Sequence, residues 1–283
     1  MRGMSLKQIN ALREEPGRAL LLFITERCPV GCAHCSVDSR ADSPSIEDFA
    51  LFEQLLEGLV ARPGLELVGI SGGEPFVEKR GLQLAVDALR GAGKTTVVYT
   101  SGVWARGAKR VPHWINQTLR NVDTVFLSSD TFHEASVSDL DLVRAVNAIV
   151  DSGAGLIMQT LDQPEMVVQA KRILETALGK DWHSLCELSL VPPLPYGRAE
   201  DLFQIQTRHP TEQFGRCGSL ASPVVRFDGV ITACCNEAVI MGQGASRLRR
   251  TAKTSAEVSS IIDTNYQDSL LAGIQRAGIG RMA

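Results

Sequence analysis

The chain has 283 residues, of which 44% are hydrophobic and 22% charged, so it can bury a sizeable core and is not disordered as a whole. Its formal net charge of −3 gives no bulk attraction to nucleic acid or to a membrane surface. There is no signal peptide, and the apolar run 19–24 is too short to span a bilayer. We therefore expect a cytoplasmic protein without nucleic-acid or membrane partners, whose seven cysteines bind metal more readily than they form disulfides.

Short apolar runs alternate with segments of helical periodicity through the first two thirds of the chain. Such alternation predicts a parallel sheet with right-handed crossovers. Six strand–helix units are two short of a full eight-stranded barrel. The predicted fold class is therefore α/β, a partial (β/α)6 TIM barrel. The expected strands are 20–25, 65–70, 95–100, 122–127, 156–160 and 185–191, and the expected helices are 45–60, 81–89, 139–150 and 165–178.

The alternation ends at a proline-rich segment, Pro192–Gly197, which can continue neither a helix nor a central strand. Cysteines, glycines and short β-like runs follow it. This composition predicts a second, smaller module. We expect a barrel over residues 1–195 and a cysteine-containing module over 196–283, with strands at 224–227 and 230–232 and a C-terminal helix at 255–274.

Three cysteines, Cys28, Cys32 and Cys35, directly follow the first predicted strand. Thiolates are strong ligands for iron, and three of them on a four-iron cluster leave one iron open, much as a catalytic zinc keeps one open position. Gly31 lets the loop turn tightly. The alternative is a structural zinc loop, but no further cysteine follows within the next 150 residues, and His34 lies between two ligands.

This CxxxCxxC pattern resembles the cluster motif of the radical S-adenosylmethionine (SAM) superfamily, with His34 where the family usually has an aromatic residue. The turn Gly72-Gly73-Glu74-Pro75 after the second strand resembles the family's GGEP motif, which contacts the amino group of SAM. A carboxylate can accept from an ammonium, and paired glycines allow close backbone approach. The resemblance covers most of residues 19–191 and implies the partial barrel expected from the alternation.

Two weaker matches lie at the ends of the next two strands. Ser101, in Thr100-Ser101-Gly102, resembles the family's turn after the third strand, and Ser128 with Asp130 resembles its SxD element. Both are candidate SAM contacts at the mouth of the barrel, where barrel enzymes place their chemistry.

The resemblance implies an enzyme that holds a SAM-binding [4Fe–4S] cluster on Cys28, Cys32 and Cys35. Such an enzyme cleaves SAM reductively to a 5′-deoxyadenosyl radical, which abstracts a hydrogen atom from the substrate. An external electron donor, such as flavodoxin or ferredoxin, is implied as a partner. No catalytic side chain beyond these cofactor-binding residues is assigned.

A second group of cysteines, Cys217, Cys234 and Cys235, lies in the smaller module. Cys217, Gly229 and Cys234 fit the spacing of SPASM and Twitch extensions, which carry auxiliary [4Fe–4S] clusters, and Asp228-Gly229 is a hairpin signal. The downstream cysteines of a full SPASM module are missing, so the resemblance implies a shortened module with at most one auxiliary cluster. Cys186 could supply a fourth ligand, and a vestigial module with free thiols is the alternative.

His133 lies beside two acids in the segment Asp130–Glu134. It could be an acid/base group on the substrate side, or belong to an ordinary polar approach to the next helix. The sequence favours the second interpretation.

Three functions remain open from the sequence. The first is modification of a ribosomally made peptide, and the second is radical oxidation of a small alcohol or sugar. Peptide maturases often carry an N-terminal leader-binding domain, for which the 27 residues before Cys28 are too few, so a separate leader-peptide-binding protein is expected. The third is a non-enzymatic iron–sulfur protein, which would not need the Gly72–Pro75 turn. We favour the peptide substrate.

Overall fold

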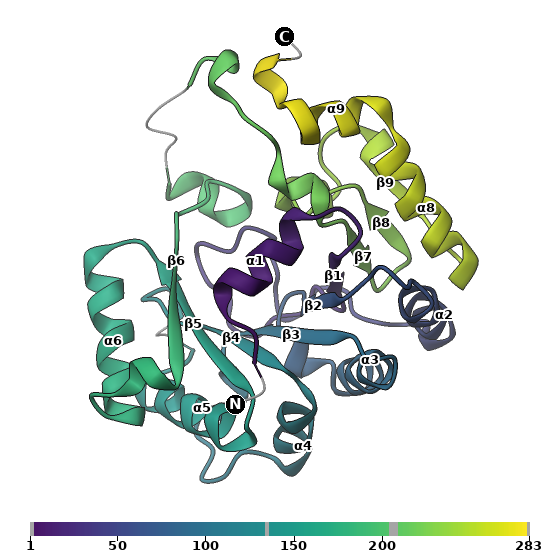
Figure 1. The fold of residues 1–283 in the computed structure, drawn as a ribbon. Coiled ribbons are helices and arrows are strands. Elements are labelled where there is room, and N and C mark those ends of the chain that lie inside the picture. The colour runs from purple at the N-terminus through teal and green to yellow at the C-terminus, as the bar shows by residue number, and fades with distance from the viewer. Residues whose placement is uncertain (1–2, 134–135, 204–208, 282–283) are drawn as a thin grey trace.

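A curved, mostly parallel sheet forms the centre of the molecule (Figure 1). The computed structural model describes residues 3–133, 136–203 and 209–281. Within them, the strands form one sheet in the order β6-β5-β4-β3-β2-β1-β7-β8-β9, and the pairs from β6 to β7 are parallel. The prediction of a partial barrel is confirmed. The parallel strands are β1 (Ala19–Phe23), β2 (Leu67–Ser71), β3 (Thr95–Thr100), β4 (Thr124–Ser128), β5 (Gly155–Leu161), β6 (Cys186–Val191) and β7 (Val224–Arg226).

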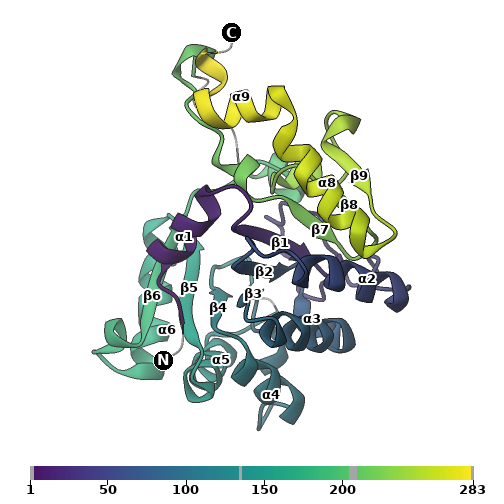
Figure 2. The same ribbon diagram turned by 45° about the vertical axis from the view of Figure 1, so that its right-hand side comes forward.

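Helices cover the outer face of this sheet (Figure 2). The predicted helix start at residue 45 is wrong, because Ser45 forms a β-bridge with Thr25 and the helix begins only after Asp48, whose side chain caps it. The sequence also missed α4. No helix among the described residues is both long and apolar enough to cross a membrane. The covering helices are α2 (Phe49–Val60), α3 (Lys79–Gly91), α4 (His113–Asn121), α5 (Asp139–Ser152) and α6 (Pro164–Leu178).

Helix α1 (Leu6–Glu14), which the sequence did not predict, lies across the inner face of the sheet (Figure 1). Ser5 and Gln8 form a capping box at its start. Its buried residues Ile9 and Leu12 pack against Val97 of β3. The next residue, Val98, belongs to the main core on the other face of the sheet, because side chains alternate along a strand. The helix therefore fills the interior of the barrel with apolar side chains.

The C-terminal part continues the barrel sheet, since β7 pairs with β1. The hairpin predicted at Asp228-Gly229 joins β7 to β8 (Val230–Thr232), with Gly229 at a φ of 86°. The predicted single helix at 255–274 is wrong: Asp268 accepts hydrogen bonds from the amides of Leu270 and Leu271 and starts a new helix there. The remaining elements are α7 (Glu237–Ile240), β9 (Arg249–Thr251), α8 (Ser255–Gln267) and α9 (Ser269–Ala277).

The contact between α2 and α8 gives a test of this packing. A Cβ on Gly58 would lie 2.6 Å from the Cβ of Val258 and 2.7 Å from the carbonyl oxygen of Ser255. We expect Gly58→Ala to lower the free energy of unfolding by about 1–3 kcal/mol through overpacking. Gly91→Ala is the matched control, because a Cβ there meets nothing within 4 Å. Equal denaturant midpoints for the two variants would contradict the close contact between α2 and α8 at Gly58.

Candidate functional site

The segments that follow five of the parallel strands meet at one end of the barrel. Parallel strands end at the same edge of a sheet, so the cysteine loop after β1, the turn 72–75 after β2 and the residues following β3, β4 and β6 all gather there. The sequence-predicted SAM contacts and the first three cysteines therefore share this end.

The turn 72–75 is clasped against the chain that leads into the cysteine loop. Gly73 N donates to Thr25 O over 2.6 Å, and Glu74 N donates to Arg27 O over 2.9 Å. A Cβ on Gly73 would lie 2.4 Å from Arg27 O, and one on Gly72, at a φ of 150°, would lie 2.3 Å from Thr25 O. Only glycine allows so close an approach of the two backbones.

Glu74 lies beneath this turn and is 1% exposed. Its Oε1 accepts from Thr100 Oγ1 (2.8 Å) and Phe76 N (3.1 Å), and its Oε2 accepts from Ser101 N (2.8 Å) and Ser101 Oγ (2.5 Å). Burial raises the pKa of Glu74, and these hydrogen bonds oppose the rise. The carboxylate therefore fixes Ser101, and a direct contact with a ligand would require one of its bonds to break.

The thiol of Cys28 lies near the thiols of Cys32 and Cys35 and near the carboxyl group of Glu74. Cys32 is 8% exposed, whereas Cys28 and Cys35 are partly exposed. Burial, together with the negative charges of Glu74, Cys32 and Cys35, raises the pKa of Cys28 to about 12, although a backbone hydrogen bond from Val30 opposes the rise. Three neighbouring thiolates need a nearby positive charge to be stable, and bound iron supplies one.

The geometry of the loop also bears on the zinc alternative. One tetrahedral zinc ion holds each sulfur at about 2.3 Å, which brings all ligand sulfurs to within roughly 4.6 Å of one another. Among the described residues, no three cysteines have their sulfurs all within 4.8 Å. As they lie in this structure, three cysteine sulfurs could not all bind one zinc ion.

Arg198, which the sequence did not single out, closes over the cysteine loop. Its Nε and Nη2 both donate to Cys32 O, over 2.9 and 2.6 Å, and its backbone N–H donates to Cys35 O over 3.0 Å. Gly197 has a φ of 58°, and a Cβ there would lie 2.6 Å from Cys35 O. The glycine within the proline-rich break after β6 was the only sequence signal of this contact.

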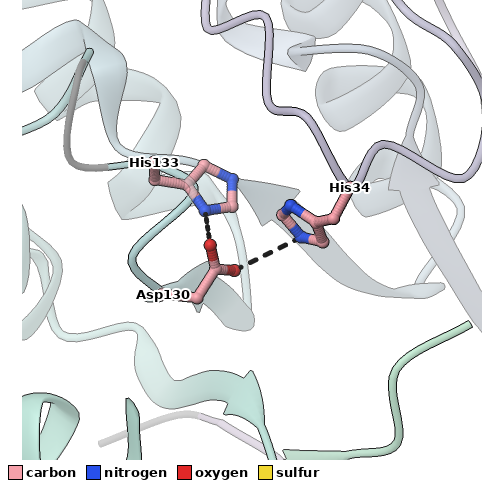
Figure 3. Close-up of side chains that lie close together, drawn as sticks. All are labelled: His34, Asp130 and His133. Atoms are coloured by element: carbon pink, nitrogen blue, oxygen red, sulfur yellow. Dashed lines mark hydrogen bonds and ion pairs between the residues drawn. The ribbon is translucent and has the colours of Figure 1, made fainter. Parts of the chain in front are cut away.

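Asp130 lies between two histidines (Figure 3). Its Oδ1 accepts from His133 Nδ1 over 2.8 Å, and its Oδ2 lies 3.4 Å from His34 Nε2. The side chain of His133 is buried and paired, and the sequence-favoured interpretation of a polar approach to the next helix stays a prediction. Glu134, its other acidic neighbour, lies outside the described residues. The carboxylate of Asp130, a predicted SAM contact, is thus directed toward these rings.

The pKa values of this group depend on burial and on mutual charge. Burial lowers the pKa of His34, although Asp130 opposes this. Burial also disfavours charge on His133, but hydrogen bonds to Asp130 and Cys32 outweigh it and raise the pKa of His133 to about 10. Burial likewise opposes charge on Asp130, yet the hydrogen bond and charge of His133 and the charge of His34 hold its pKa low.

Three buried polar atoms, one in the cysteine loop and two at the ends of β4 and β5, have no hydrogen-bond partner among the described residues. They are His34 Nδ1, Ser129 Oγ and Thr160 Oγ1. Ser128, a predicted SAM contact, is the last residue of β4 and lies opposite Gln159. Buried polar groups are rarely left unsatisfied, so these atoms fit a polar ligand at this end of the barrel.

The structure divides the second cysteine group. Cys217 and Cys234 pack in one small apolar cluster, whereas Cys235 packs against the main core, where its Sγ lies 4.0 Å from Arg13 Nη2. Burial raises the pKa of Cys234, with smaller contributions from the charges of Cys235 and Cys217. Cys186 lies in β6, which both views of the fold draw on the opposite side of the molecule from β8 (Figures 1 and 2).

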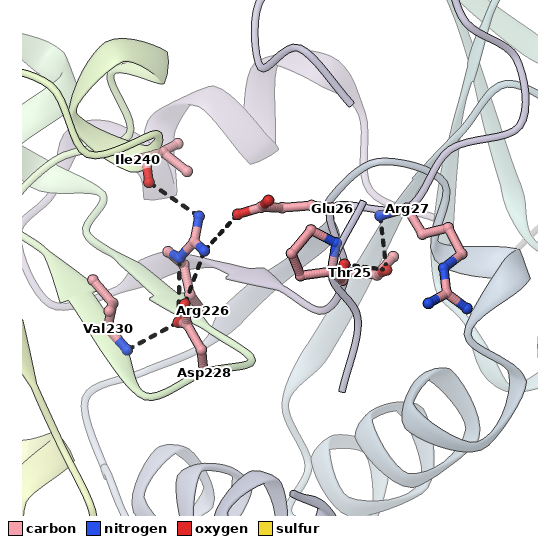
Figure 4. Close-up of polar contacts among 8 residues, drawn as sticks. Thr25, Glu26, Arg27, Arg226, Asp228, Val230 and Ile240 are labelled. Carbon is pink, nitrogen blue, oxygen red and sulfur yellow. Dashed lines mark hydrogen bonds and ion pairs between the residues drawn. The ribbon is translucent and has the colours of Figure 1, made fainter. Parts of the chain in front are cut away.

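An ion pair ties the smaller module to the chain before the cysteine loop (Figure 4). Arg226 Nη2 lies 2.5 Å from Glu26 Oε1 and 2.9 Å from Asp228 Oδ2, and Nη1 donates to Ile240 O over 3.1 Å. The Arg226 side chain is only 9% exposed. The hairpin β7–β8 is thus anchored two residues before Cys28.

Comparison with known proteins agrees with this site. Residues 22–155, which include the cysteine loop and the turn 72–75, match the sequence model of the Radical SAM superfamily. Over these residues, just under half of its length, the chain is similar to the radical SAM superfamily. The predicted resemblance, and with it the prediction of an enzyme of this superfamily, is confirmed.

Individual relatives are distant. GTP 3′,8-cyclase of Shewanella denitrificans is 28% identical over 139 residues, which are 47% of this chain and 41% of that protein. The chain thus matches less than half of that curated relative's length. Streptococcus suis SuiB bound to S-adenosylmethionine superposes with a TM-score of 0.59 at 14% identity, over 95% of this chain and 70% of SuiB.

Two further solved structures contain peptides. SuiB bound to its precursor peptide SuiA has a TM-score of 0.58 at 13% identity, over 98% of this chain and 72% of SuiB. The protein anSMEcpe, with bound AdoMet and a Cp18Cys peptide, has a TM-score of 0.59 at 12% identity, over 90% of this chain and 81% of that chain. At these identities the likenesses show a shared fold.

Arg198 gives a test of how the site is held. Arg198→Ala removes two charge-assisted bonds to Cys32 O, each of which contributes about 1.5–3 kcal/mol. We expect lower stability and fewer irons per chain after anaerobic reconstitution. Arg172→Ala is the control, because that side chain is 66% exposed and its ion pair with Asp139 is at the surface. Iron content and unfolding midpoint measure both effects. Equal values for the two variants would contradict a stabilising role of the Arg198 contact with the cysteine loop.

Proposed function

We propose that this chain is a radical SAM enzyme that modifies a ribosomally made peptide. The observation that carries the proposal is the cysteine loop, held against the Gly72–Pro75 turn at the open end of the barrel. An iron–sulfur protein used only for electron transfer would not need this turn beside its cluster.

The residues present fit the implied cofactors. Cys28, Cys32 and Cys35 would hold the [4Fe–4S] cluster. His34 Nδ1 and Ser129 Oγ, which have no partner within the part of the chain that the structure describes, would face bound SAM. When bound, the two cofactors supply a radical able to abstract hydrogen from a substrate. The protein holds the cluster loop through Arg198 and through the backbone bonds between the turn 72–75 and residues 25–27. Glu74 orients the neighbouring turn at Ser101.

The peptide substrate is inferred from the shared fold and from the peptides present in two of the related structures. SuiB and anSMEcpe, which share this fold along at least 90% of this chain, have been solved with peptides bound. A separate leader-peptide-binding protein, and flavodoxin or ferredoxin as electron donor, remain predicted partners. Radical oxidation of a small alcohol or sugar would instead give turnover with such a compound and none with any peptide.

SAM cleavage tests the proposed reaction. Anaerobically reconstituted protein with SAM and dithionite is expected to form 5′-deoxyadenosine, measured by chromatography and mass spectrometry. Changing Cys28, Cys32 and Cys35 to Ala should reduce it to background, because the cluster loses its ligands. Cys186→Ala is the control, since that cysteine is buried at the start of β6, whereas the cysteine loop follows the end of the parallel strand β1. Cleavage retained by the triple variant would refute the proposal.

Iron content tests the predicted auxiliary cluster. A cluster on Cys217, Cys234 and Cys235 would give about eight irons per chain, and the SAM-binding cluster alone about four. Replacing these three cysteines by Ala should then lower the count by about half while leaving SAM cleavage detectable without substrate. A wild-type count near four would instead support the alternative of a module with free thiols.

A further inference from the structure

Strand β6 is an open edge of the barrel sheet. It pairs with β5 alone, and the strand order ends there (Figure 1). In a parallel pair, the N–H and C=O groups of one residue point to the neighbouring strand, and those of the next residue point away from it. Val191 O accepts from Asp162 N over 2.8 Å, so the groups of Val191 point to β5. The N–H and C=O groups of Leu188 and Leu190 therefore point to the open side of the strand.

These four backbone groups have no hydrogen-bond partner among the described residues. The sheet bonds of β6 go to β5, and no described turn, loop or side chain bonds to the backbone of Leu188 or Leu190. A row of free N–H and C=O groups is a template for another strand, which proteins commonly block with charged side chains or proline. Here the prolines at 192–193 come only after the strand ends, and Glu187, the one charged residue of β6, accepts from Leu6 N over 3.2 Å.

Apolar side chains are exposed on this edge and just beyond it. Leu190 is 46% exposed, Leu194 39% and Tyr196 37%. Leu188 packs against the main core under the covering helices, and Leu190, two residues on, lies on the same face of the sheet. Directly opposite side chains on neighbouring strands contact each other. A strand added to β6 with apolar residues on this face would therefore cover Leu190.

The open edge leads to the candidate site. Because β6 runs in the same direction as β1, its end at Val191 lies at the same end of the barrel as the cysteine loop. Seven positions after Val191, the Arg198 side chain donates to Cys32 O and the Arg198 amide donates to Cys35 O. A strand advances about 3.3 Å per residue. A peptide paired along β6 would thus reach the open end of the barrel within a few residues of leaving the edge.

We propose that the open edge of β6 docks the peptide substrate, which adds to the sheet as an extended strand and places apolar side chains against Leu190. This inference rests on the proposed function, because it states how the peptide of that reaction is held. Backbone pairing supplies affinity for an extended peptide, and the side-chain contacts supply preference for its sequence. A second copy of this chain fits less well, because β6 offers six residues, whereas a standard protein–protein interface takes roughly 20–30 residues from each side.

The probe is a pool of random peptides of about ten residues, long enough to span β6 and reach the open end. The peptides are displayed on their messenger RNA and selected on the anaerobically reconstituted protein with SAM and no reductant. Dissociation constants of the labelled peptides are then measured by fluorescence anisotropy. We expect Leu190→Pro to weaken binding at least tenfold, because proline has no N–H to donate and is tolerated where an edge N–H faces solvent.

Two further variants control for the change of side chain. Leu190→Asp keeps the backbone N–H and should also weaken binding, because it sets a carboxylate against the apolar residues of the peptide. Leu140→Asp is the matched control, since Leu140 is a leucine of α5 that is 60% exposed. It should bind the peptides as the wild type does.

N-methylation of the selected peptides tests the strand geometry. Only every second residue of an added strand bonds to β6. Methyl groups on alternate backbone nitrogens should therefore abolish binding when they fall on the paired residues and leave it unchanged when they fall on the others. Sensitivity without this two-residue period would overturn the added strand.

The remaining outcomes separate this inference from the proposed function. A pool that yields no binder, or peptides that bind Leu190→Pro and Leu190→Asp as tightly as Leu140→Asp, would overturn the docking edge while the proposed function stands. If Leu190→Pro does not fold by circular dichroism, Leu190→Asp decides in the same way. A wild type that sediments as a dimer, with Leu190→Pro a monomer, would assign the edge to a second copy and overturn the peptide. Wild-type protein that forms no 5′-deoxyadenosine with SAM and dithionite would overturn the proposed function.

Discussion

Two backbone hydrogen bonds, from Gly73 N to Thr25 O and from Glu74 N to Arg27 O, hold the end of β2 against the chain that enters the cysteine loop. The remaining contacts of the site depend on this approach, which only glycines at 72 and 73 permit. The approach sets Glu74 under the end of β3, where it fixes Ser101. It also fixes the backbone one residue before Cys28. The cluster loop and the proposed SAM-binding turns thus form one unit.

Several groups at the open end of the barrel are negative when ionised, and they accept hydrogen bonds from nearby residues. Glu74 receives four hydrogen bonds, Asp130 receives two rings and the amide of Phe132, and the loop carbonyls receive Arg198. Among the described residues, the thiols of Cys28 and Cys32 have one donor each, the backbone of Val30 and the ring of His133. Bound iron would supply the positive charge that the protein leaves out. The thiols and acids at this end of the barrel therefore fit a bound metal cluster.

Local patterns predicted the parallel strands well, because each of β1–β6 is a short apolar run between turn signals. They failed where a long-range contact decides the structure. Ser45 looked helical but pairs with Thr25, and Asp268 divides a continuous apolar pattern. Helix α1 was missed because its polar sequence buries only two residues.

The predicted site residues after β1–β4 come together because parallel strands end at one edge, which the strand order alone implies. The contacts of Arg198 with Cys32, and of Arg226 with Glu26, join residues 166 and 200 positions apart, and no local pattern encodes them. The most direct test of the account compares the electron paramagnetic resonance spectrum of the reduced, reconstituted protein with and without SAM. An iron left open by three cysteines should bind SAM and change the g-values. Identical spectra at saturating SAM would contradict the account.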